Sequence, residues 1–195
     1  MEARWESIPD PFGVVEAEIA AMRWRPELAV ETLPAPVKLA PFAAAVGAEV
    51  ELAGQELGNG RLVVLHDPAG QEAWGGDFRC VGYAHADTDH ELVADPCLAD
   101  VGWDWLLDAL AQERAAYANP SGTVTAISSK SFGSMKDDPQ RCEVELRASW
   151  TPLLDRGRGI TAHLRAWSQL LCQIAGLPPT ADGVIALHTR RVRRR

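Results

Sequence analysis

The segment from Arg141 to Trp150 alternates strictly between apolar and polar residues, and this pattern constrains the fold more than any other feature of the chain. Successive side chains of a β-strand point to opposite faces of its sheet, so a period of two predicts a strand with one buried and one solvated face. Such a strand is typical of an antiparallel sheet that packs on one side only. The buried side takes Cys142, Val144, Leu146, Ala148 and Trp150, and the solvated side takes Glu143, Glu145, Arg147 and Ser149.

Other short segments rich in β-branched and aromatic residues also predict strands. The second and third of them form a hairpin whose loop, residues 67–77, contains one proline and several glycines and is expected to be a long, mobile tip. The breaker residues 119–122 are expected to precede the fourth strand, and a polar loop joins it to the alternating segment. The predicted strands are residues 27–33, 61–66, 78–85, 123–129 and 141–150.

Four segments carry apolar residues at helical spacing. Asp10 followed by Pro11 is a typical helix start, and Gly176 followed by prolines is a typical helix end. The second predicted helix rests on an apolar stripe of Leu39, Phe42, Val46 and Val50 and on several alanines. The predicted helices are residues 11–25, 41–52, 95–117 and 161–175.

The predicted element order is α-β-α-ββ-α-ββ-α. This order indicates an α+β fold, with a largely antiparallel sheet of about five strands and helices packed on one face. Residues 1–187 are expected to form a single domain, and residues 188–195 a basic C-terminal tail. By analogy of fold, the order resembles type III secretion chaperones, many of which are homodimers that bind other proteins.

The charge distribution limits contact with nucleic acids to the C-terminus. The net charge is −8, and five of the 19 basic residues lie in the tail, so the rest of the chain stands at −13 (−8 minus 5). An acidic surface repels phosphate, so a nucleic-acid accessory role could rest only on the tail, which equally suits a solvated chain end. The tail arginines are Arg190, Arg191, Arg193, Arg194 and Arg195.

The sequence also indicates a cytoplasmic protein. No window approaches the ~18 consecutive apolar residues of a membrane-spanning helix, and no basic stretch followed by an apolar one opens the chain. The four cysteines lie far apart, without the short paired spacing of zinc or redox motifs. We therefore expect reduced thiols, no cofactor and no membrane contact.

A group of histidines and aspartates follows the third predicted strand. His85, Asp87, Asp89 and His90 offer imidazole and carboxylate, the ligands of zinc, manganese and iron sites. His66 could join them if strand register allows it. Aspartates also cap turns, and the pattern favours this explanation, so we assign no metal here and keep the four residues as weak candidates.

Two carboxylates, Glu143 and Glu145, lie on the solvated side of the alternating strand, about 7 Å apart by the strand repeat. Paired carboxylates can act as acid and base when one of them is desolvated. Because nothing apolar on that side would desolvate them, the pattern favours a solvated sheet face and no catalytic residue.

The tryptophans suggest a partner-binding surface. Trp105 is turned about 200° around a helix axis from Trp103, away from the leucine face of its predicted helix. Either the helix begins after Trp105, or a second packing layer buries it, or it emerges beside Asp104 and Asp108 as an anchor for another chain. Trp74, next to two glycines, either closes over a partner or packs under its loop.

Four stretches of the chain resemble an actinobacterial family known as domain of unknown function 3000. The resemblance covers most of residues 11–187 and leaves the first residues and the arginine tail unmatched. The family has no established activity, cofactor or catalytic residues, so the resemblance implies none here. The stretches are Leu65–Arg79 (LHDPAGQEAWGGDFR), Trp103–Leu106 (WDWL), Glu143–Leu153 (EVELRASWTPL) and Leu171–Pro179 (LCQIAGLPP).

The sequence favours a non-enzymatic module that binds a protein or peptide, or a second copy of itself, through a surface that contains tryptophan. A metal-dependent hydrolase built on the histidine and aspartate group is the first alternative. A nucleic-acid accessory protein acting through the arginine tail is the second.

Overall fold

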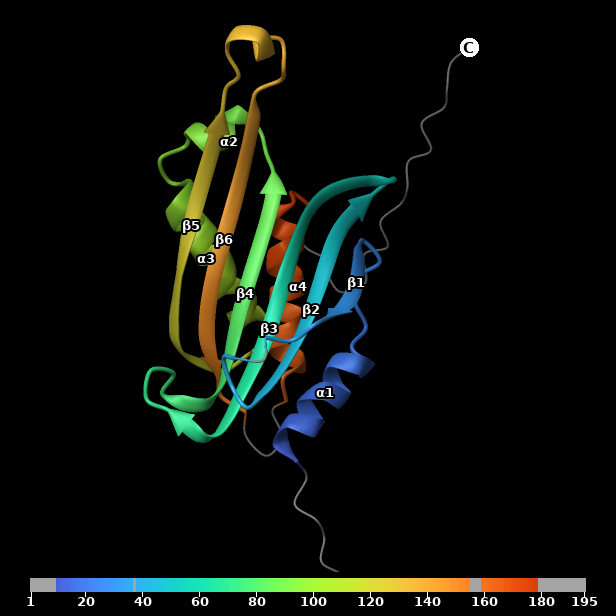
Figure 1. Cartoon of the computed structure of the whole chain (residues 1–195), viewed down its shortest axis with the longest axis vertical. Coiled ribbons are helices and arrows are strands. Elements are labelled where there is room, and N and C mark those ends of the chain that lie inside the picture. The colour runs from blue at the N-terminus through green and yellow to red at the C-terminus, as the bar shows by residue number, and fades with distance from the viewer. Residues whose placement is uncertain (1–9, 37, 155–158, 179–195) are drawn as a thin grey trace, which may run out of the picture.

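The computed structural model describes residues 10–36, 38–154 and 159–178 and shows an α+β fold (Figure 1). Residues 188–195, the predicted basic tail, lie outside the described residues. The helices are α1 (Pro11–Ala21), α2 (His90–Ala94), α3 (Leu98–Gln112), α4 (Thr161–Ile174) and the 3₁₀ turn η1 (Gly133–Met135). The strands are β1 (Leu28–Leu33), β2 (Phe42–Leu52), β3 (Gln55–Gln71), β4 (Gly76–Asp87), β5 (Tyr117–Ser129) and β6 (Arg141–Pro152).

The strands form one antiparallel sheet in the order β1-β2-β3-β4-β6-β5. Figure 1 shows α3 and α4 behind this sheet, and no helix in front of β4, β6 and β5. This arrangement confirms the predicted antiparallel sheet with helices on one face, and it has one strand more than expected. We call the uncovered side of the sheet the outer face.

The additional strand is β2, where the sequence analysis wrongly predicted a helix over residues 41–52. Phe42, Val46 and Val50 are four residues apart, a spacing that fits one face of a strand as well as one face of a helix. The burial of Ala48 distinguishes the two, because Val46, Ala48 and Val50 are alternate residues that all point into the core, as they do in a strand. The turn after β2 contains Gly54 at a φ of +80°, which lets the chain reverse directly into β3.

The strand ends also differ from the predicted ones. β3 extends as far as Gln71, and β4 already begins at Gly76. The hairpin tip is therefore a short turn at residues 72–75 and not an eleven-residue loop. The breaker residues 119–122 lie inside β5, where the register shifts between Ala118 and Ser121. A β-bulge tolerates such residues at a sheet edge, because the bulged residues leave the ladder.

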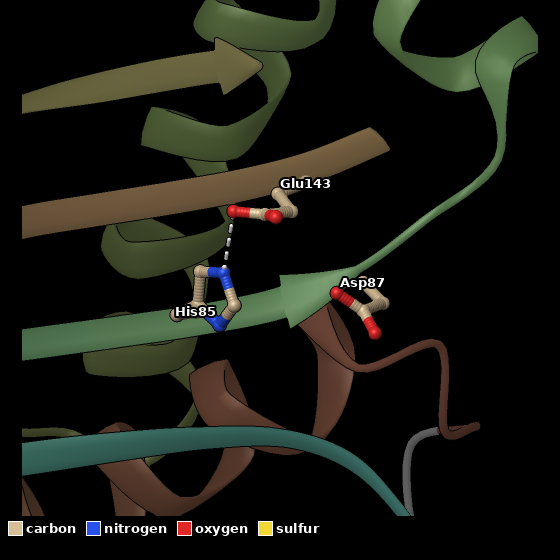
Figure 2. A group of neighbouring side chains, drawn as sticks. All are labelled: His85, Asp87 and Glu143. Carbon is tan, nitrogen blue, oxygen red and sulfur yellow. Dashed lines mark hydrogen bonds and ion pairs between the residues drawn. The ribbon is translucent and has the colours of Figure 1, made fainter. Parts of the chain in front are cut away.

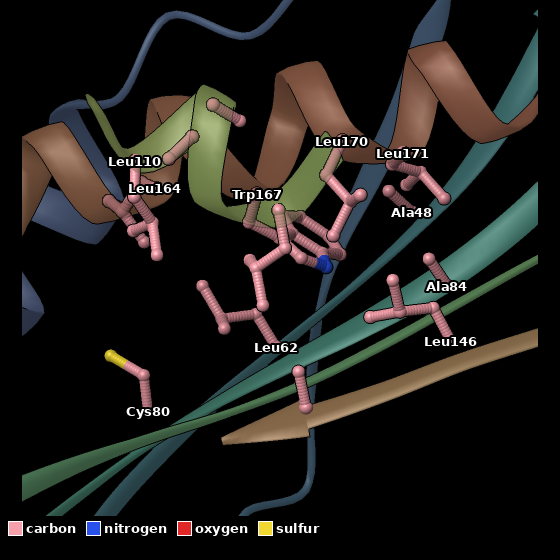
Figure 3. Close-up of a cluster of buried hydrophobic side chains, with 14 of the residues drawn as sticks. Ala48, Leu62, Cys80, Ala84, Leu110, Leu146, Leu164, Trp167, Leu170 and Leu171 are labelled. Atoms are coloured by element: carbon pink, nitrogen blue, oxygen red, sulfur yellow. The ribbon is translucent and has the colours of Figure 1, made fainter. Parts of the chain in front are cut away.

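The core lies between the sheet and the helices, as the alternation of β6 predicted. Figure 3 shows the apolar face of α4 packed over the strands, with Trp167 fully buried in the middle. The indole Nε1 of Trp167 donates a hydrogen bond to the carbonyl of Tyr83 in β4, at 3.4 Å. Gly60 permits this close packing, since a Cβ there would lie 2.7 Å from the same carbonyl oxygen. The residues labelled in Figure 3 are Ala48, Leu62, Cys80, Ala84, Leu110, Leu146, Leu164, Trp167, Leu170 and Leu171.

Among the helices of the described residues, none is long and apolar enough to cross a membrane. The four cysteines are all free thiols, and three of them are buried. Burial raises the pKa of Cys172 to about 11, so its thiol stays protonated and packs as a small apolar group.

Candidate functional site

The outer face is organised by β4. Its inward side chains include Cys80, Ala84 and Ala86, which belong to the core. The alternate residues point away from the helices and form a row along the middle of the outer face. We call them the β4 row: Arg79, Val81, Tyr83, His85 and Asp87.

The β4 row begins with Arg79, a guanidinium that is 8% exposed. It donates hydrogen bonds to the carbonyl of Asn119 at 2.9 Å and to the hydroxyl of Thr151 at 3.0 Å. It also donates to the hydroxyls of Ser121 and Ser149, at 3.2 and 2.7 Å. Burial lowers the pKa of Arg79, and its partners among the described residues are all neutral. Arg79 therefore ties β4 to β5 and β6 while its positive charge stays unbalanced locally.

Trp74 at the hairpin tip extends the same network. Its carbonyl accepts hydrogen bonds from the side-chain amide of Asn119 at 2.9 Å and from the hydroxyl of Thr151 at 2.5 Å. The indole packs against a small apolar cluster on the outer face made of Ala45, Val63 and Leu65. The predicted long tip is therefore a short turn, and Trp74 packs under it.

A hollow of about 560 Å³ lies on the outer face over β4, β6 and β5, between the Arg79 network and the far end of the β4 row. Val81, an apolar side chain that is 38% exposed, forms part of its wall. Hydroxyl groups and one guanidinium supply the polar part. The lining residues are Val81, Gly82, Tyr83, Ser121, Gly122, Thr123, Arg147, Ala148 and Ser149.

Tyr83, Glu145 and Arg147 form a compact polar group at the edge of this hollow. The phenol of Tyr83 donates to Glu145 Oε2 at 3.1 Å, and Arg147 Nε pairs with Glu145 Oε1 at 2.9 Å. The Arg147 guanidinium also lies over the Tyr83 ring, 5.7 Å from its centroid. Burial raises the pKa of Tyr83, and the hydrogen bond to Glu145 raises it further. Glu145 is thus already engaged by a donor and a cation, instead of lying free on a solvated face.

Figure 2 shows the end of the β4 row, where His85 and Asp87 meet Glu143 of β6. His85 Nε2 lies 3.2 Å from Glu143 Oε2, and one ligand atom from each of the three residues lies within 4.8 Å of the others. The three residues come together because Asp87 is opposite Glu143 in the β4–β6 register. In the described part of the chain, this is the one group of three or more His, Cys, Asp or Glu residues that is close enough to share a metal ion.

The other weak metal candidates lie elsewhere. Asp89 is the N-cap of α2, and its carboxylate accepts a hydrogen bond from the amide of Leu92 at 2.8 Å. This is the turn-capping role that the sequence analysis favoured. His90, the first residue of α2, is exposed. His66 is buried on the helix side of the sheet and stacks on Phe78 with ring centroids 4.1 Å apart, so it cannot reach the outer face.

A family model described as a protein of unknown function (DUF3000) matches residues 8–185, which is most of the 195-residue chain. The chain belongs to the DUF3000 family. This membership confirms the resemblance noted in the sequence. The family description names no activity, and no curated protein and no solved structure matches the chain.

The second surface that the sequence suggested lies on α3 of this DUF3000 protein. The helix begins at Leu98, which excludes a start after Trp105. Trp105 is half-buried and packs against the main core, while Asp104 and Asp108 are exposed beside it. Trp105 is therefore partly buried by the main core itself, and no second layer covers it among the described residues. Its role as a partner anchor, together with Trp74, Asp104 and Asp108, stays a prediction.

Neither the role of Arg79 nor the link between His85 and Glu143 was predicted from the sequence. Arg79 sits in an alternating strand, where an outward arginine normally lies in solvent, and its polar partners come from β5 and β6, which are distant in the sequence. Glu143 was seen as half of a carboxylate pair with Glu145. Both omissions depend on the pairing of β4 with β6, which is not a pairing of consecutive strands.

Proposed function

We propose that this chain is a non-enzymatic module that binds a protein by pairing an extended strand of that protein with the free edge of β5. The observation that supports the proposal is the edge itself. Among the described strands, β5 pairs with β6 alone, and no strand pairs with its other edge, although α2 and α3 also contact β5 (Figure 1). Its backbone N–H and C=O groups on that side are therefore ready to form a ladder with another chain.

The composition of β5 makes this edge unusual. Natural sheets protect their edges with short strands, lysines, prolines or inward-pointing charges. The opposite edge, β1, follows this rule, because it has six residues and contains Glu31. β5 has 13 residues, and residues 121–129 contain neither a charged side chain nor a proline. A long, uncharged edge of this kind is a good template for an added strand.

The hollow on the outer face adds a means of selecting the partner. Strand addition takes its affinity from main-chain hydrogen bonds and its specificity from pockets for alternate side chains. Ser121 and Thr123 of β5 line the hollow, so a large side chain of an added strand could lean over β5 into it. Val81 would contact an apolar part of that side chain, and the guanidinium of Arg147 would donate hydrogen bonds to an acidic or carbonyl group of it.

A second copy of the chain is a special case of the same proposal. Two β5 edges related by a two-fold axis run antiparallel, so they could pair directly and join two sheets into one. The homodimer suggested by the fold analogy would then use the same edge as a peptide partner. The two uses compete with each other, because one edge accepts one strand.

A lysine placed on β5 tests the proposal. Thr125 is exposed and lies opposite Glu145 in β6, so Thr125→Lys should be tolerated by the fold. The matched control is Thr32→Lys, the same change at an exposed position of the other edge strand, β1. Peptides that bind the wild-type chain are selected from a displayed random library, and self-association is measured by sedimentation velocity.

We expect Thr125→Lys to weaken peptide binding or self-association by about tenfold, equivalent to ~1.4 kcal/mol, and Thr32→Lys to change neither. Hydrogen exchange of amides 121–129 should slow when a peptide is bound. Peptides that bind both variants as well as wild type, or protection that appears on α3 instead of β5, would contradict the proposal.

A further inference from the structure

The far end of the β4 row carries a second property that does not depend on strand addition. We propose that His85, Asp87 and Glu143 bind one divalent transition-metal ion on the outer face (Figure 2). The three side chains offer one imidazole nitrogen and two carboxylate groups. This set suits zinc, manganese and iron, and two carboxylates balance the charge of a divalent ion.

The spacing of the ligand atoms fits such an ion after a small adjustment. Zinc binds nitrogen and oxygen ligands at about 2.0–2.2 Å, so two ligands of one ion lie at most about 4.4 Å apart. The 3.2 Å between His85 Nε2 and Glu143 Oε2 is already within this limit. The ligand atoms of the whole group lie within 4.8 Å of one another, and Asp87 is exposed, so its carboxylate can turn inward by the small amount required.

The group is held by backbone structure and not by chance proximity of surface side chains. His85 and Asp87 are alternate residues of β4, and Glu143 is paired opposite Asp87. The amide of Thr88 donates a hydrogen bond to the carbonyl of Cys142 at 2.8 Å, which fixes the chain directly after Asp87 and directly before Glu143. The side chains of His85 and Glu143 are 22% and 28% exposed, so both have already lost much of their freedom. Little ordering is left for a metal to impose.

The charges around the group favour a cation. Glu145, the neighbouring carboxylate, is satisfied by Tyr83 and Arg147. The carboxylate of Glu143, by contrast, has His85 as its one partner within the described residues, and the carboxylate of Asp87 has no hydrogen bond or ion pair there. Two carboxylates next to one imidazole leave net negative charge at this end of the row. A divalent ion bound to His85 Nε2 would neutralise the charge of both carboxylates.

The proposal can be tested by titrating metal alone into tag-free, chelator-treated protein and following heat by calorimetry. Zn²⁺ and Mn²⁺ are expected to bind with one ion per chain, Zn²⁺ more tightly, because affinity for nitrogen and oxygen ligands rises from manganese to zinc. Mg²⁺ is expected to give no binding at the same concentration, since it prefers oxygen ligands and retains its water.

His85→Ala and Glu143→Gln should each weaken Zn²⁺ binding by at least about tenfold while the far-ultraviolet circular dichroism stays that of wild type. Three controls should bind as wild type. Asp89→Asn and His90→Ala change the weak candidates outside the group, and Cys97→Ser removes the exposed thiol. No binding of Zn²⁺ at micromolar concentration would overturn the proposal, as would unchanged binding in His85→Ala or loss of binding in any of the three controls.

Discussion

Acid is expected to destabilise this protein through His163, a buried histidine of α4 that is 1% exposed. The indole Nε1 of Trp150 donates a hydrogen bond to His163 Nδ1 at 3.1 Å, so Nδ1 must keep its lone pair and the imidazole must be neutral. Burial lowers the pKa of His163 from 6.5 to about 4. Protonation would place a charge in the core and break the bond to Trp150.

The size and sign of the effect follow from linkage. Between pH 6.5 and 4 the unfolded chain binds a proton at this residue that the folded chain does not bind, so the free energy of unfolding falls as pH falls. Each pKa unit corresponds to about 1.4 kcal/mol. The full loss from this histidine is therefore about 3 kcal/mol, a large share of the 5–15 kcal/mol typical of a domain.

A variant isolates this contribution from the titration of the many carboxylates. His163→Asn keeps an oxygen acceptor near the position of Nδ1 and cannot be protonated in this range. Urea unfolding, followed by tryptophan fluorescence between about pH 7 and 4.5, gives the free energy of unfolding of both proteins. Over this pH interval the wild type should lose about 2.5 kcal/mol more than the variant, because the interval covers most of the span between the two pKa values of His163. Parallel losses in the two proteins would refute the assignment of His163 as a neutral, buried acceptor.

Two further predictions concern tryptophans of the helical layer. Trp167→Ala should lower the free energy of unfolding by ~3–5 kcal/mol in urea titrations, because it empties a fully buried site and removes a hydrogen bond to the Tyr83 carbonyl. A change below ~1 kcal/mol would contradict the packing of α4. Trp105→Ala should lower the free energy of unfolding by ~1–2 kcal/mol, since the side chain is half-buried. It should leave the sedimentation coefficient unchanged if β5 is the docking edge. Loss of self-association without loss of stability would instead assign docking to α3.

The sequence predicted best those elements whose periodicity has one interpretation. β6 alternates over ten residues, and its buried and outward sides are as expected. α4 ends at Gly176, which adopts the left-handed conformation expected of a glycine at a helix end. The prediction for β2 was wrong because alanines and valines four residues apart fit the period of a helix and the period of a strand equally well. The deciding information, that the segment pairs with β1 on one side and β3 on the other, is not local.

The candidate site was predicted in pieces. The sequence marked His85 and Asp87 as possible ligands and Glu143 as half of a carboxylate pair, but it could not join them. The strand that pairs with β4 on the side away from β3 is β6, which follows two α-helices and another strand in the sequence. Periodicity fixes the face on which a side chain lies, and it carries no information about which strand lies next to it.

The position of β6 between β4 and β5 has a consequence for how the molecule folds. The sheet consists of a meander, β1 to β4, and a β5–β6 hairpin, which meet along one seam. Contacts within each half are local, whereas the bonds across the seam join residues 70 positions apart for Arg79 and Ser149 and 62 apart for Tyr83 and Glu145. Closing chain loops of this length slows folding, so the seam forms after the two halves. A nascent chain therefore has neither the buried arginine nor the histidine–carboxylate group until β6 has been synthesised and docked.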